Sequence, residues 1–347
     1  MILLMKRRCP EHGVDRVVRH LKEMGADHRV LENSGHTVIE VLGDAESLDR
    51  TWLEREPVVD RLIDEAEPIL AADRQPGDCT REILLGDSAT IGGTGIGVVA
   101  GPCSVETLSR LLEVAAAVKE AGAVGLRGGA FKPRTSPYSF QGLGERGLEM
   151  LAMAGEETGL AIVTEVMCSG DVELVASYAD VLQVGSRNMH CTNLLAAVGR
   201  QSKPVLLKRG WSATLEEFIM AAEYVMKEGN PNVILCERGI RTHEEYVRNT
   251  LALAVVPEVK RRSRLPIIVD PSHGTGHRHL VAPMSRAAIA CGADGLLIEV
   301  HIAPERAWCD AGQSLSPDQF QVLMAGLDPI AEACGRHLRP ARATEPV

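Results

Sequence analysis

Short runs of apolar and β-branched residues recur from residue 98 onward, and longer segments with helical spacing separate them. Each run is nearly continuous in apolar residues, which is typical of parallel strands buried on both faces. The segments between them include residues 108–120 and 215–227, whose apolar positions repeat with the period of a helix. The runs are eight in number and cover residues 98–100, 124–126, 161–166, 181–184, 204–207, 232–236, 266–270 and 295–300. Eight strand-then-helix units predict a (β/α)8 TIM barrel.

A doubly wound open sheet is the alternative arrangement of such units. It rarely needs eight strands, and it usually carries a glycine-rich phosphate loop after its first strand. The sequence shows no such loop there. The stretch GGTG at residues 92–95 lies between two strand-like runs instead, and it predicts a hairpin turn.

The first 73 residues show a different order of elements, βαββαβ. Strands are predicted at residues 2–6, 28–31, 37–42 and 58–63, and helices at residues 14–24 and 45–54. Each helix carries one apolar stripe, and a split βαβ unit of this kind forms a compact two-layer module. Residues 71–78, with Gln-Pro-Gly at 75–77, are typical of a linker. We therefore expect a small domain at residues 1–73, a linker and β-hairpin at 74–97, and the barrel at 98–347.

Composition places the chain among soluble globular proteins. Of 347 residues, 45% are hydrophobic and 24% charged, and no apolar stretch reaches the roughly 18 residues of a membrane span. The apolar start ends at Lys6 without a signal cleavage site, and the nine cysteines form no C-x-x-C pair, so we expect a cytoplasmic protein with free thiols. The net charge of −10 argues against a nucleic-acid partner, whereas local Arg and Lys clusters still permit anionic small molecules.

Polar residues follow nearly every predicted strand of the barrel. Barrel enzymes place catalysis at the carboxyl ends of the strands. Any one of these residues alone would be explained by an exposed charge, but their convergence from eight loops at one end of a barrel indicates an active site. They are Cys103, Arg127, Glu165, Arg187, Lys208, Arg209, Arg238, His273, Glu299 and His301.

Four of the polar residues at this end of the barrel form a set suited to metal binding. Cys103, His273, Glu299 and Asp310 supply one thiolate, one imidazole and two carboxylates, which favours Mn, Fe, Co or Zn over Mg or Ca. A lone cysteine or histidine is usually structural, so the prediction depends on the four together. The nearby histidines at 277 and 279 are expected to be surface residues.

A second group of residues predicts an anion pocket. Arg forks bind phosphate and carboxylate bidentately, so one small ligand carrying both groups would fit. The segment FKPRTS at 131–136 adds a second cationic loop with hydroxyls, suited to a second phosphorylated substrate; the alternative is an ordinary solvated loop. The pocket residues are Arg127, Lys132, Arg187, Lys208 and Arg238.

Five motifs resemble those of 3-deoxy-D-arabino-heptulosonate 7-phosphate (DAHP) synthases, in the same order. They are GPCSVE at 101–106, LRGGAFKPRT at 126–135, LKRG at 207–210, CERG at 236–239 and VDPSH at 269–273. The amino-terminal module and the hairpin resemble the type I subgroup with a fused ferredoxin-like regulatory domain, so the resemblance covers nearly the full chain. It implies a TIM barrel preceded by a ferredoxin-like domain.

The resemblance also implies roles for individual residues. The four metal-type residues would hold one divalent metal ion, and the five pocket cations would bind phosphoenolpyruvate. Erythrose 4-phosphate would bind to Lys132, Pro133, Arg134 and Thr135. The catalytic residues would be Lys132 as a proton donor, Glu165 beside the phosphoenolpyruvate, and His273. Tyrosine or phenylalanine would act as an effector through the amino-terminal module, and the enzyme would form a homo-oligomer, a dimer or tetramer.

Two departures from the family pattern bear on substrate detail and assembly. Cys168 stands where an acidic residue is expected, and His190-Cys191-Thr192 replaces Gln-Asn-Phe. Neither removes a predicted ligand, and both fit a copy specialised for a secondary-metabolite pathway. Two rival functions remain: a synthase of an eight- or nine-carbon sugar acid, whose aldose loop usually reads Lys-Ala-Asn-Arg, and a catalytically silent sensor of aromatic metabolites.

Overall fold

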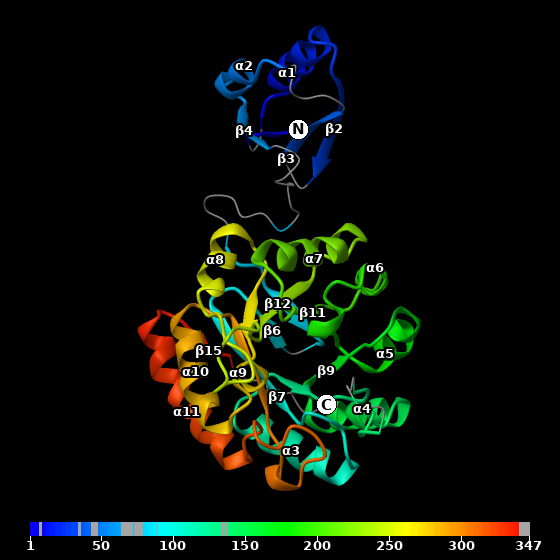
Figure 1. The fold of residues 1–347 in the computed structure, drawn as a ribbon, viewed down its shortest axis with the longest axis vertical. Helices are drawn as coiled ribbons and strands as arrows, with labels where there is room; N and C mark the ends of the chain where they lie inside the picture. Colours follow the sequence, from blue (N-terminus) through cyan, green and yellow to red (C-terminus); the bar gives the residue numbers. More distant parts are fainter. Residues whose placement is uncertain are drawn as a thin grey trace. The chain divides into compact units, whose positions relative to one another are not determined.

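The computed structural model describes residues 1–6, 9–33, 36–42, 48–63, 72, 79–87, 89–132, 136 and 138–339. The chain divides into two compact units, Met1–Leu70 and Ala71–Val347 (Figure 1). Each unit has its own hydrophobic core. No helix in these described ranges is long and apolar enough to cross a membrane.

The first unit is the predicted two-layer βαββαβ module. Its strands form an antiparallel sheet in the order β2-β3-β1-β4, which places the amino-terminal strand between two later ones. Val17 and Leu21, on the apolar stripe of the first helix, are fully buried against Leu3 and Ile39 of the sheet. The elements are β1 (Ile2–Met5), α1 (Glu11–Glu23), β2 (Asp27–Asn33), β3 (His36–Leu42), α2 (Arg50–Arg55) and β4 (Val59–Ile63).

The second unit is a closed barrel of eight parallel strands, as the apolar runs predicted. Each strand pairs with its neighbour along the chain, and the last pairs with the first to close the barrel. Their residues are buried almost throughout, which explains why their sequences are continuous in apolar residues. The strands are β7 (Gly95–Gly101), β8 (Gly125–Arg127), β9 (Ala161–Glu165), β10 (Val181–Val184), β11 (Val205–Lys208), β12 (Val233–Glu237), β13 (Ile267–Val269) and β14 (Gly295–Glu299).

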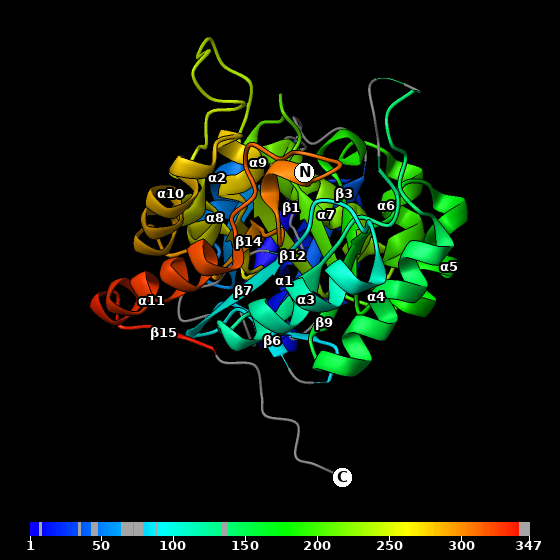
Figure 2. The same ribbon diagram turned by 90° about the horizontal axis from the view of Figure 1, so that it is seen from below.

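Helices lie around the outside of the strands (Figures 1 and 2). Two begin and end at the predicted residues, and side-chain caps explain where they begin: Thr107 accepts from the amide of Arg110, and Thr214 forms a capping box with Glu217. The helices are α3 (Leu108–Glu120), α4 (Glu145–Thr158), α5 (Val172–Tyr178), α6 (Thr192–Gly199), α7 (Leu215–Lys227), α8 (Val255–Arg262), α10 (Arg278–Ala290) and α11 (Pro317–Ala333). A further short helix, α9 (Pro271–Thr275), follows β13 directly.

The amino-terminal end of the barrel is closed by a small hairpin, which leaves the carboxyl end for the site. Strands β5 (Ile83–Leu85) and β6 (Ala89–Ile91) pair antiparallel, and their apolar side chains pack into the barrel core. The predicted turn at residues 92–95 is present, closed by an antiparallel bridge between Gly92 and Gly95. This turn joins β6 to β7. The turn of the β5–β6 hairpin itself lies earlier in the chain, and its first residue is Gly86, which has a positive φ.

Candidate active site

Four potential metal ligands converge at the carboxyl end of the barrel. Cys103 follows β7, His273 follows β13, Glu299 ends β14, and Asp310 lies on the loop before α11. One donor atom from each lies within 4.8 Å of those of the other three. Cys103 Sγ is 3.1 Å from Asp310 Oδ2, and His273 Nε2 is 3.1 Å from Glu299 Oε1. The donor set predicted from sequence therefore forms one cluster in space.

Cationic side chains contact this cluster directly. Arg127 Nη1 donates to Glu299 Oε1 at 2.8 Å, and both side chains are almost fully buried. Lys132 Nζ donates to the Cys103 carbonyl at 3.0 Å and lies 3.1 Å from its sulfur. Gln313 Nε2 donates to the other oxygen of Glu299 at 2.8 Å. Buried charges are stable only when paired and hydrogen-bonded, and these contacts supply the pairing.

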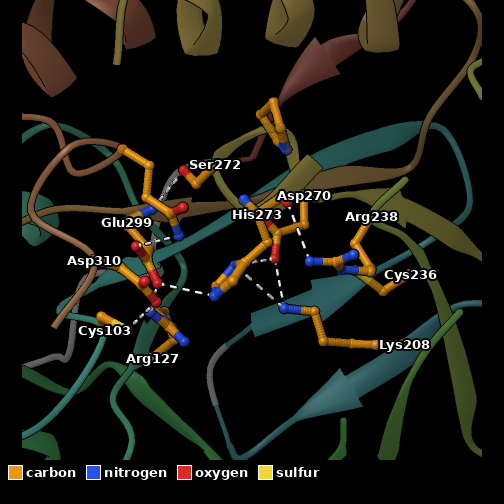
Figure 3. A network of polar contacts seen from close by, with 12 residues as sticks. Cys103, Arg127, Lys208, Cys236, Arg238, Asp270, Ser272, His273, Glu299 and Asp310 are labelled. Carbon is orange, nitrogen blue, oxygen red and sulfur yellow. Dashed lines mark hydrogen bonds and ion pairs between the residues drawn. The ribbon is translucent and has the colours of Figure 1, made fainter. Parts of the chain in front are cut away.

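Asp270 orients the histidine of the cluster (Figure 3). Its carboxylate accepts from His273 Nδ1 at 2.7 Å and from the His273 amide at 2.9 Å, which leaves Nε2 facing Glu299. A carboxylate behind a metal-binding histidine fixes the ring and raises its basicity. Lys208 Nζ pairs with the same carboxylate at 2.5 Å, so Asp270 also links the metal-type cluster to the cations.

The cluster shifts the pKa values of its own members in opposite directions. Burial opposes the charged imidazole, but Asp270 and Glu299 more than offset it and raise the pKa of His273 to about 9. Burial likewise opposes the Glu299 carboxylate, yet His273 and Arg127 bring its pKa far below the ordinary value. The pKa of the Cys103 thiol is raised by its contact with Cys309 and by burial.

A cavity of about 380 Å³ opens beside the cluster. The five predicted pocket cations all line it, together with His273 and Asp310 of the metal-type cluster. One glutamate, one glutamine, several serines and a glycine, one tryptophan and a sixth cation complete the wall. The lining residues are Arg127, Lys132, Ser136, Ser139, Glu165, Gln183, Gly185, Ser186, Arg187, Lys208, Trp211, Arg238, Arg248, His273 and Asp310.

The Arg238 guanidinium has a buried N–H group available to bind an anion. Its Nη2 donates to the His273 carbonyl at 3.1 Å, whereas its Nη1 is buried without a hydrogen-bond partner among the described residues. An unsatisfied buried guanidinium donor is costly, and an anionic ligand in the cavity would satisfy it. The Trp211 ring lies 5.9 Å from the Arg238 guanidinium and 5.8 Å from that of Arg187, within the range of cation–π contact.

Glu165 lines the cavity at the end of β9. Gln183 Nε2 donates to its Oε2 at 3.3 Å. Its other oxygen lies over Gly185, where an added Cβ would be only 2.0 Å from Oε1. A side chain at position 185 would therefore collide with this carboxylate. The structure places Glu165 beside the anion pocket, where the sequence predicted it.

Several other polar residues at the strand ends lie outside the cavity. Arg209 forms a buried ion pair with Glu237 at 2.8 Å and also donates to the Ala213 carbonyl, so it is structural. His301 contacts Glu106 instead of the cluster. His277 and His279 are exposed, as expected.

The aldose loop can be followed only at its flanks. Pro133, Arg134 and Thr135 lie outside the described residues.

Among the residues that line the cavity or contact the cluster, two charged residues and one aromatic residue were not assigned from sequence: Asp270, Trp211 and Arg248. Asp270 lies within the VDPSH motif, and a carboxylate three residues before a metal-type histidine was an available signal. Trp211 follows the LKRG motif in a chain with only 3% aromatic residues, which was a weaker signal. Arg248 lies in an irregular loop with no pattern, yet its Nη1 is 3.5 Å from Asp310 and 3.1 Å from Gln313.

The fold and the site together define a (β/α)8-barrel enzyme with a mixed thiolate, imidazole and carboxylate metal site beside a polycationic pocket. Residues 79–332 match the DAHP synthetase I family, and residues 1–64 match the DAHP synthase ferredoxin-like domain. The chain belongs to the DAHP synthetase I family, in the form that carries this amino-terminal domain.

Individual relatives agree with this membership. The phospho-2-dehydro-3-deoxyheptonate aldolase of Thermotoga maritima is 43% identical over 335 residues, which cover 96% of this chain and 99% of that protein. Its crystal structure superposes with a TM-score of 0.78 and covers 97% of this chain. A 2-dehydro-3-deoxyphosphooctonate aldolase of Syntrophotalea carbinolica is 35% identical over 65% of this chain and 87% of that protein. The identity is therefore higher, and extends further, toward the heptonate enzyme.

Proposed function

We propose that the cavity at the carboxyl end of the barrel is where this DAHP synthase condenses phosphoenolpyruvate with erythrose 4-phosphate and water. The products are 3-deoxy-D-arabino-heptulosonate 7-phosphate and inorganic phosphate, in the first step of the shikimate pathway or in a secondary-metabolite copy of that step. One observation carries the assignment. The four-donor cluster and the cationic cavity are contiguous, because His273 and Asp310 belong to both.

The donor set fits one divalent ion of the group Mn, Fe, Co or Zn, since a thiol and an imidazole join two carboxylates. Cys103, His273, Glu299 and Asp310 would hold the ion. When bound, it supplies Lewis-acid polarisation of the aldehyde oxygen.

The five cavity cations would hold phosphoenolpyruvate. Arg127, Lys208 and Arg238 are buried, so their charges act in a medium that screens them little. Held there, the enol attacks the aldehyde carbon through its C3, and the π electrons form the new C–C bond. Water then adds at C2 and gives up one proton, the bond from C2 to the phosphate oxygen breaks, and phosphate leaves with that electron pair. The remaining hydroxyl at C2 loses its proton to the departing phosphate, which leaves the C2 ketone of the product.

Lys132 and Glu165 are proposed to move protons in this sequence. Burial opposes the charge of Lys132, but negative charge on the Cys103 and Cys309 sulfurs when they are ionised, and on Glu299, outweighs it, and the pKa of Lys132 is raised. Lys132 is therefore charged at neutral pH and would donate a proton to the oxygen of the former aldehyde. Glu165, on the cavity wall, would orient the attacking water and accept its proton.

Residues 133–135 are proposed to bind the phosphate of erythrose 4-phosphate, together with Lys132. Support comes from both flanks, since Lys132 and Ser136 line the cavity. A Pro-Arg-Thr sequence supplies a guanidinium and a hydroxyl for a phosphate.

Consumption of phosphoenolpyruvate across a panel of aldose phosphates tests the proposal. We expect turnover with erythrose 4-phosphate, little with five-carbon aldose phosphates, and none after exhaustive chelation. Preference for a five-carbon aldose would support the sugar-acid synthase instead. Absence of phosphate release with every aldose and metal would support a silent sensor.

We further propose that the amino-terminal unit is a regulatory domain that binds tyrosine or phenylalanine. Its support is an independent core, with Leu3, Val17 and Ile39 buried among themselves, and a sheet that contributes no residue to the described cavity. Allostery requires the effector to favour one state of the enzyme, and a coupling of about 1 to 3 kcal/mol would suffice.

Truncation tests this regulatory role. A chain beginning near Gln75 should retain condensation and lose inhibition by tyrosine or phenylalanine. A solved Thermotoga maritima enzyme described as truncated covers 77% of this chain at 45% identity, which supports the use of a shortened chain in this test. An insensitive full-length enzyme, or a truncated enzyme inhibited as strongly, would contradict the proposal.

We also propose a cytoplasmic homo-oligomer, a dimer or a tetramer. None of the nine cysteines, all of which lie among the described residues, forms a disulfide, which fits a reducing compartment. Light scattering of the full-length and truncated enzymes would give the number of subunits.

A further inference from the structure

A buried carboxylate that takes no part in the cavity holds the loop that carries Asp310. Glu106 lies between β7 and α3, three residues after the ligand Cys103. Its side chain is only 3% exposed, although it is charged. A buried carboxylate needs specific partners. The partners of Glu106 come mainly from the segment between β14 and α11, which is far from it in sequence.

Two hydrogen bonds join Glu106 to that segment. Its Oε1 accepts from the backbone amide of Trp308 at 2.7 Å, two residues before Asp310. Its Oε2 lies 3.3 Å from His301 Nε2. The other ring nitrogen of His301 accepts from the Ala303 amide at 3.0 Å, so Nε2 carries a proton and donates to Glu106. One carboxylate thereby holds this segment at two points, His301 near its start and Trp308 two residues before Asp310.

Asp310 needs such support because its backbone is in a conformation that non-glycine residues avoid. Its φ is +50°, the only positive φ outside glycine among the described residues. A conformation of this kind persists only where the surroundings impose it. Beyond Asp310, Gln313 and Ser314 donate to its carbonyl at 3.2 and 3.3 Å. On the other side, the Trp308 amide donates to Glu106, and the Trp308 ring packs edge-on against Phe140 with the ring centroids 5.0 Å apart.

We infer that Glu106 is a positioning residue that holds the Asp310 loop in the conformation that binds the metal. The inference deepens the proposed function, since it presumes that Cys103, His273, Glu299 and Asp310 are the ligands. Glu106 and Cys103 share one short loop, so the same loop supplies one ligand and fixes the position of another. Loss of Glu106 would leave three ligands in place and release the fourth.

Glu106→Gln is the informative substitution. The amide keeps the size of the side chain but turns one acceptor oxygen into a donor, which would face donors from Trp308, His301 and Arg110. Partners behind metal ligands typically contribute 10- to 100-fold to affinity, so Co²⁺ should bind about 10- to 100-fold more weakly. Arg110→Gln is the matched control. It removes a partner of Glu106 that is 35% exposed, leaves both bonds to the loop, and should change affinity less than about threefold.

The experiment measures Co²⁺ affinity by chelator competition, with the absorption spectrum of the Co²⁺ protein as a second readout. We expect Glu106→Gln to retain the thiolate-to-cobalt charge-transfer band of Cys103 while its d–d bands change, since only the Asp310 ligand is released. A purely structural role would lower the melting temperature of the metal-free protein and leave Co²⁺ affinity unchanged. If Glu106→Gln does not fold, Glu106→Asp keeps the charge, shortens the reach by one methylene and should show the same loss.

The outcomes separate this inference from the proposed function. A wild-type enzyme that binds no Co²⁺ would overturn the proposed metal site itself. A wild type that binds Co²⁺, with Glu106→Gln equal to it or with Arg110→Gln equally impaired, would overturn only the role of Glu106.

Discussion

Metal binding at this site should be steeply dependent on pH because the metal must displace protons. His273 Nε2 must be free of its proton, and Asp270 and Glu299 outweigh burial to hold the pKa of His273 at about 9. The pKa of the Cys103 thiol is raised as well, by its contact with Cys309 and by burial. At neutral pH the metal-free enzyme therefore carries two protons that metal binding releases.

The steepness of the pH dependence follows from the number of protons that metal binding releases. Each displaced proton makes the apparent affinity rise about tenfold per pH unit while the pH is below the pKa of its group. With both His273 and Cys103 protonated, the apparent Kd should fall about 100-fold per unit between pH 6 and pH 8. An imidazole with the ordinary pKa of about 6.5 would contribute little above pH 7. A steep dependence above pH 7 is thus the specific signature of the raised pKa.

Asp270→Asn isolates the contribution of the histidine. The substitution removes the largest interaction that raises the pKa of His273. Above pH 7 the ring would then be neutral, so metal binding should release about one proton fewer and the pH slope should fall to about tenfold per unit. Asp171→Asn, which removes a surface carboxylate that contacts Cys168, is the matched control.

Calorimetry in phosphate and Tris buffers counts the released protons, and chelator competition gives the Kd at each pH. The reasoning fails if the wild type releases fewer than one proton at pH 7.5. It also fails if Asp270→Asn releases as many protons as the wild type while binding metal.

Three further predictions concern single side chains. Cys103→Ser should weaken metal binding by more than about 100-fold, because loss of a residue that only supports a metal ligand already costs about 10- to 100-fold in affinity. Elemental analysis after dialysis measures the bound metal, and full metal content would contradict this prediction. Arg134→Ala should raise the KM for erythrose 4-phosphate far more than that for phosphoenolpyruvate, and steady-state kinetics showing the reverse would refute the loop assignment. Trp211→Leu should raise the KM for phosphoenolpyruvate about 2- to 30-fold, since its contacts with Arg187 and Arg238 are worth about 0.5 to 2 kcal/mol; an unchanged KM would show that the indole does not orient these cations.

The barrel was predictable because its signals are local. A parallel strand buried on both faces favours apolar residues at nearly every position, so the run Val-Ile-Leu-Cys at residues 233–236 is recognisable without its neighbours. The helix at Leu108–Glu120 is likewise defined by its own stripe and by the Thr107 cap. The β5–β6 hairpin was harder, because each of its strands buries only its first and third residues and so carries too little pattern to distinguish it from a loop.

The site was predictable only in part, because the end of a strand determines where a residue lies but not which groups its side chain contacts. Lys208 and Arg209 are adjacent, yet Lys208 lines the cavity and Arg209 pairs with Glu237. Their opposite roles follow from the alternation of side chains along the strand, which requires knowing which face points inward. Arg248 reaches Asp310 from an irregular loop whose path no local pattern specifies.

The two departures from the family pattern lie at residues that do not line the cavity. Cys168 is exposed, and its thiol donates to Asp171 at 3.1 Å within the first turn after β9. His190 and Cys191 are also exposed, and Cys191 precedes the first residue of α6. None of these positions lines the cavity, whereas the buried neighbour Met189 accepts from the Gly210 amide beside the cation-bearing strand. Cys168, His190 and Cys191 therefore lie at exposed positions, and we expect substitutions at these three residues to leave the cavity and its cations unchanged.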